Sequence, residues 1–264
     1  MDFAAMMELE QHGIDTFVGA GPRYPWGGLY GGQIVSQGLR AAGATVDAQY
    51  RPHSLHAYFI RRGDHDEPIR FEVDRVRNGR SFVTRRVVAR QSIGAILTMA
   101  ASFQVDEEEA AVQTVAMPPV PSPETLTSDG WSDVFDRRFV PTDTPGRALG
   151  WLRLNGVKGG DPLLDACALA YVSDDLPTDA IVALHPDRPE SWGDGEEFPF
   201  MNASLDHAIW FHRPLPADEW HLQDFTCHGL LGSRGLAIGH VFGAGGSHAA
   251  TITQEIVLRR VRGR

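Results

Sequence analysis

Two patterns of apolar positions alternate along this chain, one with helical spacing and one with the alternation of half-buried strands. Apolar positions at helical spacing cover residues 33–42, after a glycine-rich stretch, and a second apolar helix is predicted at 162–173. Strands are predicted at 55–60, 69–77, 81–90 and 95–105 after the first helix, at 135–140 and 148–154 before the second, and at 203–212, 220–230, 234–243 and 247–260 after it. A helix followed by an antiparallel meander, found twice, indicates an α+β fold.

The two halves are separated by a stretch of different composition. Residues 106–128 open with Asp106-Glu107-Glu108-Glu109 and continue with a proline-rich run, which predicts an extended, solvated linker. The expected domains are therefore residues 1–105 and 129–264. The acidic stretch 185–199 is predicted to be a long loop, either a lid or a tolerated insertion.

Composition excludes several classes of protein. A formal net charge of −10 disfavours generic nucleic-acid binding, and no apolar run reaches the 18 or so residues that a membrane-spanning helix needs. The N-terminus lacks the pattern of a secretory signal, so we expect a cytoplasmic location. The two cysteines, Cys167 and Cys227, have no metal-ligand spacing around them, and neither a disulfide framework nor a zinc site is expected.

One local basic stretch could still bind a phosphorylated small molecule. Arginines flank a predicted Asn78-Gly79 hairpin turn within residues 75–90. The competing interpretation is that these arginines form only the solvated face of a strand.

The chain also contains one pattern twice. The run Ser54–Arg62 is echoed by Ser204–Arg213, and the strand ending at Gln104 is echoed by the strand ending at Gln254. Between Asp15 and Asp47 the first helix region has no acidic residue, whereas the second helix is followed by Asp174-Asp175. A duplicated fold with a glycine-rich helix start in one half and a carboxylate in the other suits a composite site between the halves.

Five separated blocks stand out along nearly the whole chain: Leu29-Tyr30-Gly31-Gly32-Gln33, the run 53–64, Ser102-Phe103-Gln104, the run 205–214 and Thr253-Gln254-Glu255. In this order they resemble the type II acyl-CoA thioesterases, the TesB-like family. A helix wrapped by an antiparallel sheet, twice in one chain, is the double hotdog arrangement.

The resemblance implies hydrolysis of fatty acyl-CoA to free fatty acid and CoA by an activated water, without a metal or another cofactor. By motif, the catalytic residues are Asp174, Ser204 and Gln254. Ser204 stands where the family commonly has Thr, which keeps the hydroxyl but loses the methyl that restricts its rotamer. Acyl-CoA is the expected partner, and the family implies a homodimer or homotetramer.

Without the family resemblance, these three residues differ in how strongly each indicates a catalytic site. Asp174 follows a helix whose negative end would raise a carboxylate pKa, but, taken alone, the residue is better interpreted as a solvated helix-end Asp. Gln254 places an amide in the apolar row of a strand and needs polar partners, which a backbone group could also provide. Ser204 is uninformative by itself.

The start of the first helix is the expected oxyanion and substrate-binding site. Backbone amides at Gly31, Gly32 and Gln33 could donate to the thioester oxygen, because helix N-termini favour negative charge and glycine permits close approach. The alternative is that these glycines serve only packing.

Two other functions remain open. Hotdog folds also host enoyl-thioester hydratases and dehydratases, which use an acid/base pair, so His56 or His207 could act with Asp174 if one of them faces the same cavity. Asp206 and His207 are not expected to form a dyad, because strand neighbours point to opposite faces. A non-catalytic acyl-CoA-binding protein is the third possibility.

Overall fold

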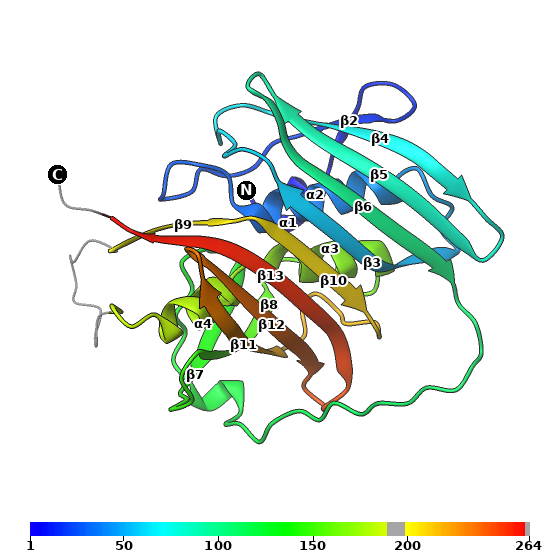
Figure 1. Ribbon diagram of the computed structural model, residues 1–264. Coiled ribbons are helices and arrows are strands. Elements are labelled where there is room, and N and C mark those ends of the chain that lie inside the picture. Colours follow the sequence, from blue (N-terminus) through cyan, green and yellow to red (C-terminus); the bar gives the residue numbers. More distant parts are fainter. Residues whose placement is uncertain (189–198, 262–264) are drawn as a thin grey trace.

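The two predicted halves share one antiparallel sheet. The computed structural model describes residues 1–188 and 199–261. Its sheet has thirteen strands in the order β1-β2-β4-β5-β6-β3-β10-β13-β12-β11-β8-β7, with β9 paired to β13 (Figure 1). The first half contributes β1 (Glu10–Gln11), β2 (Thr16–Gly19), β3 (Tyr50–Phe59), β4 (Ile69–Asn78), β5 (Phe82–Gln91) and β6 (Gly94–Val105). The second contributes β7 (Phe135–Val140), β8 (Arg147–Leu154), β9 (Phe200–Ser204), β10 (Asp206–Phe211), β11 (His221–Leu231), β12 (Arg234–Gly243) and β13 (His248–Arg260).

The seam between the halves is a strand pair. β3 lies antiparallel to β10, with Ala57 opposite His207 and Leu55 opposite Ile209. These four positions are buried and face the inner side of the sheet. The halves are therefore joined by main-chain hydrogen bonds as well as by side-chain packing.

Two central helices fill the inside of this sheet. α2 (Gly31–Gly43) and α3 (Pro162–Val172) contact each other there (Figure 1). The Ser36 hydroxyl donates to the Cys167 carbonyl oxygen across this contact, at 2.7 Å. A Cβ on Gly32 would lie 2.1 Å from the Tyr171 carbonyl oxygen, so the two backbones could not approach so closely with any other residue.

The linker differs in one respect from its expected solvated course. Residues 106–134 contain no helix or strand except the short 3₁₀ turn η1 (Pro123–Thr125), as an extended linker predicts. However, Val115, Met117 and Val120 pack on a small apolar cluster of the second half that includes Trp151. The Trp151 ring N–H also donates to the Pro121 carbonyl oxygen. The reason is that this outer patch of the sheet is apolar and the linker covers it.

Several elements were not expected from the sequence. α4 (Leu176–Leu184) begins directly after Asp174-Asp175 and packs on β8 and β11, and α1 (Phe3–Met6) precedes β1 and β2 at the N-terminus. The predicted strand 203–212 is two strands, β9 and β10, with Leu205 between them. Most of the predicted 185–199 loop lies outside the described residues. No described helix is long and apolar enough to cross a membrane.

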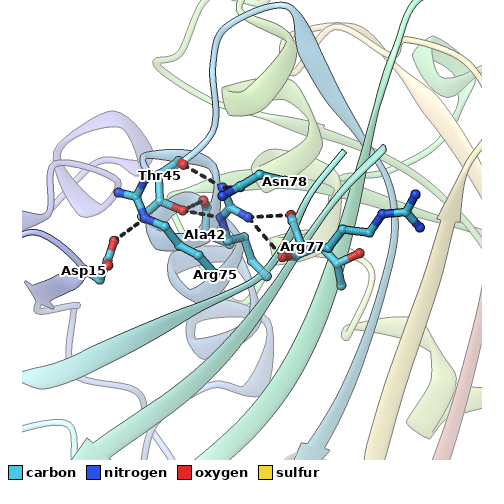
Figure 2. A network of polar contacts seen from close by, with 8 residues as sticks. Asp15, Ala42, Thr45, Arg75, Arg77 and Asn78 are labelled. Atoms are coloured by element: carbon cyan, nitrogen blue, oxygen red, sulfur yellow. Dashed lines mark hydrogen bonds and ion pairs between the residues drawn. The ribbon is translucent and has the colours of Figure 1, made fainter. Parts of the chain in front are cut away.

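A buried arginine closes the far end of α2. All five N–H donors of Arg85 bond to neutral acceptors: the hydroxyl and carbonyl oxygens of Thr45, the Asn78 side chain, and the carbonyl oxygens of Arg77 and Thr84 (Figure 2). The Thr45 hydroxyl in turn donates to the Ala42 carbonyl oxygen in the last turn of α2. The guanidinium therefore lies at the negative end of this helix, which stabilises a buried cation that has no carboxylate partner.

We expect Arg85→Met to lower the free energy of unfolding by about 3 kcal/mol, because it removes five hydrogen bonds and leaves buried acceptors unpaired. Urea denaturation measures the change. Arg86→Met is the matched control: Arg86 is exposed on the same strand and pairs with Asp74, so its loss should cost about 0.5 kcal/mol or less. Equal effects of the two substitutions would contradict a structural role for the buried network.

Candidate active site

The Asp174 carboxylate lies buried where the end of α3 meets the start of α2. It follows Ser173, the C-terminal cap of α3, and only 8% of the residue is exposed. Its Oδ2 accepts a hydrogen bond from the Gly32 N–H at 2.9 Å. The carboxylate thus connects the second half of the chain to the first.

Ser204 and Gln254 complete the site from two paired strands. The Gln254 Nε2 donates to Asp174 Oδ1 at 2.7 Å and to Ser204 Oγ at 2.8 Å. The Ser204 hydroxyl donates to the same Oδ1 at 3.1 Å. The structure therefore brings together the three residues that the family motifs indicate, in one closed set of hydrogen bonds.

A β-bulge makes this arrangement possible. Ser204 lies opposite Ile256 and Ala208 opposite Thr253, so four steps along β9 and β10 match three along β13. The extra residue falls at the break between the two strands, where the Asp206 carboxylate accepts the Glu255 N–H. Strict alternation would put Ser204 and His207 on opposite faces, whereas the bulge turns both toward the interior.

His207, one of the two histidines considered as a partner of Asp174, contacts Gln254 instead. It is fully buried, its Nδ1 contacts Gln254 Oε1, and its Nε2 lies 2.8 Å from the Ser173 hydroxyl. Burial lowers the pKa of His207 to about 4, so the ring is neutral at physiological pH. Because Gln254 Oε1 can only accept, the neutral ring donates from Nδ1, and its Nε2 accepts from the Ser173 hydroxyl in competition with the Ala170 carbonyl oxygen, which lies 3.1 Å from that hydroxyl.

His207 therefore fixes the orientation of the Gln254 side-chain amide. With Oε1 held by His207, the Nε2 of Gln254 must point at Asp174 and Ser204. The pairing of His207 with Gln254 depends on the strand register, which no motif in the sequence gives.

The start of α2 differs from expectation in the use of its amides. The Gly32 N–H, which was expected to face the oxyanion, donates to Asp174. The Gln33 side chain turns inward, accepts from the Tyr24 hydroxyl and donates to Gln37. Gly31 borders the cavity, and a Cβ there would lie 2.5 Å from Asp174 Oδ2, so glycine provides the room for the carboxylate.

A cavity of about 660 Å³ opens beside Asp174 and Ser204. Its wall combines residues from α2, the end of β3, the segment before β7, and β9, and is mainly apolar or aromatic: Trp26, Leu29, Tyr30, Ile34, Phe59, Ile60, Trp131, Phe200 and Met201. This volume suits a small-molecule site. Gln254 and His207 lie behind the wall, since neither borders the cavity.

Burial sets the electrostatics of the carboxylate. It raises the pKa of Asp174 from 3.8 to about 6, against hydrogen bonds from Gln254, Ser204 and Gly32 that lower it. Such a group is mostly ionised at neutral pH yet basic enough to accept a proton. The neighbouring Asp175 has another role, because it pairs with Arg137 at 2.8 Å and accepts from the Trp131 ring N–H.

The remaining polar candidates lie elsewhere. His56 is exposed on the outer face of the sheet, edge-on to Trp210. The side-chain ligand atoms of Asp64, His65 and Asp66 lie close enough together, beside the cavity mouth, to bind one metal ion. However, the Asp66 carboxylate already pairs with Arg23. These residues border no part of the cavity described above.

Half of the six arginines in the basic stretch 75–90 form ion pairs in the part of the chain that the structure describes. Arg75 pairs with Asp15, Arg86 with Asp74 and Arg90 with Glu72, while Arg85 is buried. The pairing favours the solvated strand face over a phosphate site.

Fold and site together define a double hotdog protein with a buried carboxylate at a cavity between its halves. Two family models, described as the N-terminal and the C-terminal domain of acyl-CoA thioesterases, match residues 21–104 and 113–258. The chain belongs to the acyl-CoA thioesterase family. It is therefore a hydrolase acting on thioesters, and the predicted resemblance and double hotdog fold are confirmed.

Individual relatives agree with this assignment. Acyl-CoA thioesterase 2 of Haemophilus influenzae is 32% identical over 257 residues, covering 88% of this chain and 87% of that protein. Acyl-coenzyme A thioesterase 8 of Mus musculus is 34% identical over 264 residues, covering 88% and 80%. The crystal structure of the acyl-CoA thioesterase II TesB2 from Mycobacterium marinum is 36% identical, with a TM-score of 0.85 over 100% of this chain and 99% of that one.

We expect His207→Ala to lower kcat about 100-fold with little change in KM, because a misoriented Gln254 misplaces the groups around Asp174. Steady-state kinetics separates the two constants. His207→Asn keeps a hydrogen-bond donor toward Gln254 and should recover part of the kcat that His207→Ala loses. If His207 served only in packing, the two variants would lose the same stability and His207→Asn would recover no kcat.

Proposed function

We propose that Asp174, Ser204 and Gln254 together activate the water that hydrolyses an acyl-CoA thioester: Asp174 takes the water proton, while Ser204 and Gln254 orient its carboxylate. The observation that carries the proposal is the closed set of hydrogen bonds among these three side chains beside the cavity. Fatty acid and CoA are the products.

The chemistry follows from the hydrogen bonds already made. Asp174 Oδ1 accepts from Ser204 and Gln254, whereas Gly32 is the one donor to Oδ2 among the described residues, so a water bound on the cavity side would donate to Oδ2. Oδ2 takes the water proton as the oxygen attacks the thioester carbon. The tetrahedral intermediate then collapses, the carbon–sulfur bond breaks, and the proton on Asp174 passes to the CoA thiolate.

The oxyanion would bind at the start of α2. Among the described residues, no protein group accepts a hydrogen bond from the Gly31 N–H, and Gly31 borders the cavity. This amide is therefore a better donor for the oxyanion than the Gly32 N–H, which Asp174 already uses.

The hydratase alternative has less support. It requires a histidine in the same cavity as Asp174, yet His56 lies on the outer face and His207 reaches Asp174 only through Gln254. The cytoplasmic location, the homodimer or homotetramer, and the boundaries 1–105, 106–128 and 129–264 stay predictions.

Release of free thiol from short, medium and long acyl-CoAs tests the function directly. Asp174→Asn should lower kcat at least about 1,000-fold, because the amide cannot accept the water proton. Asp224→Asn is the control, since Asp224 pairs with Arg147 away from the cavity and its loss should leave turnover unchanged. A protein that binds acyl-CoA without releasing thiol would instead be a binding module.

The pH profile tests Asp174 as the base. Because its pKa is raised to about 6, kcat/KM should fall below that pH as the carboxylate takes up a proton and should level off above about pH 7. An acid limb near the ordinary value of 3.8, or one that persists in Asp174→Asn, would exclude this role.

A further inference from the structure

The mouth of the cavity carries two arginines that pair with no carboxylate in the described part of the chain. Arg61 and Arg62 follow β3 directly, are exposed, and border the same cavity as Asp174. Among residues 1–188 and 199–261, no carboxylate forms an ion pair with either guanidinium, unlike Arg75 on β4 and Arg86 and Arg90 on β5. In a chain with a net charge of −10, an uncompensated pair at a substrate cavity indicates an anionic ligand group.

Each guanidinium is anchored to the backbone by one N–H group, and its other donors bond to none of the residues that the structure describes. Arg61 Nη1 donates to the Ala95 carbonyl oxygen at 2.8 Å, and Arg62 Nη2 donates to the Trp26 carbonyl oxygen. A Cβ on Gly28 would lie 2.4 Å from Arg62 Nε, so this glycine provides the space that the guanidinium occupies. An arginine held in this way presents its remaining N–H groups in the fork that matches phosphate oxygens.

An exposed indole lies beside these arginines. Trp26 is 44% exposed and also borders the cavity. One of its faces stacks on Tyr24 at 5.1 Å with an interplanar angle of 10°, and Trp131 packs edge-on at 5.0 Å. The ring is thus fixed in place and partly open to solvent, which suits stacking of a nucleobase.

We propose that Trp26, Arg61 and Arg62 form a subsite for the nucleotide end of CoA, which carries an adenine, a pyrophosphate and a 3′-phosphate. The inference rests on the proposed function, since it places the acyl-CoA with its thioester at Asp174 and its nucleotide at the cavity mouth. The phosphates bind the two guanidinium groups and the adenine stacks on Trp26. The subsite lets the enzyme favour CoA thioesters over pantetheine thioesters that lack the nucleotide.

The test compares octanoyl-CoA with octanoyl-pantetheine, which share the thioester and differ in the nucleotide. Wild type should show the higher kcat/KM with octanoyl-CoA. The double variant Arg61→Gln/Arg62→Gln should lower the ratio of the two kcat/KM values roughly 10- to 100-fold, through the KM for octanoyl-CoA. Trp26→Ala should lower the same ratio, while Arg86→Gln, from a paired and exposed arginine, should leave it unchanged.

If the double variant leaves the ratio of the two kcat/KM values unchanged, the proposed subsite is overturned. This holds whether the variant loses activity with both substrates or with neither. A binding measurement keeps the test independent of turnover. Calorimetry should show 3′-phospho-ADP binding to wild type and to Arg86→Gln but not to the double variant; no binding to wild type also overturns the proposal. Nucleotide binding without thiol release from either substrate would support the subsite and count against the proposed catalysis alone.

Discussion

The structure depends on the close contact between the end of α3 and the start of α2, where Asp174 is buried. Gly32 allows the contact because a Cβ there would lie 2.1 Å from the Tyr171 carbonyl oxygen, and its N–H holds the carboxylate. Burial raises the pKa of Asp174 from 3.8 to about 6, which corresponds to a bias of about 3 kcal/mol against the charged form. The same packing that closes the core therefore raises the proton affinity of the carboxylate, as its proposed role of base requires.

The duplicated halves diverged at this position. Asp174 is the residue after the C-terminal cap of α3, and Thr45 is the residue after the cap of α2. Asp174 is hydrogen-bonded to the Gln254 amide, whereas Thr45 is hydrogen-bonded to the Arg85 guanidinium, which uses all five of its donors (Figure 2). One end of the helix pair thus carries the proposed catalytic groups, and the other is filled by the buried Arg85 guanidinium.

The site also shows how a local irregularity can set function. The bulge between β9 and β10 turns both Ser204 and His207 inward, so that one contacts Asp174 directly and the other orients Gln254. A continuous strand over 203–212, as the alternation predicts, would separate them. The polar chain from Ser173 through His207 and Gln254 to Asp174 follows from this one extra residue.

The sequence by itself determined the two apolar helices, the succession of strands and the family motifs, because helical and strand periodicity and short residue blocks are local. It also indicated Gln254, since an amide in an apolar row must find buried partners. It did not show α4, the packing of the linker, or the use of the Gly32 N–H. The tertiary structure alone decided these features, together with the pairing of His207 and the place of the free arginines at the cavity. Each depends on strand register or on contacts between segments up to about 150 residues apart, which no local pattern encodes.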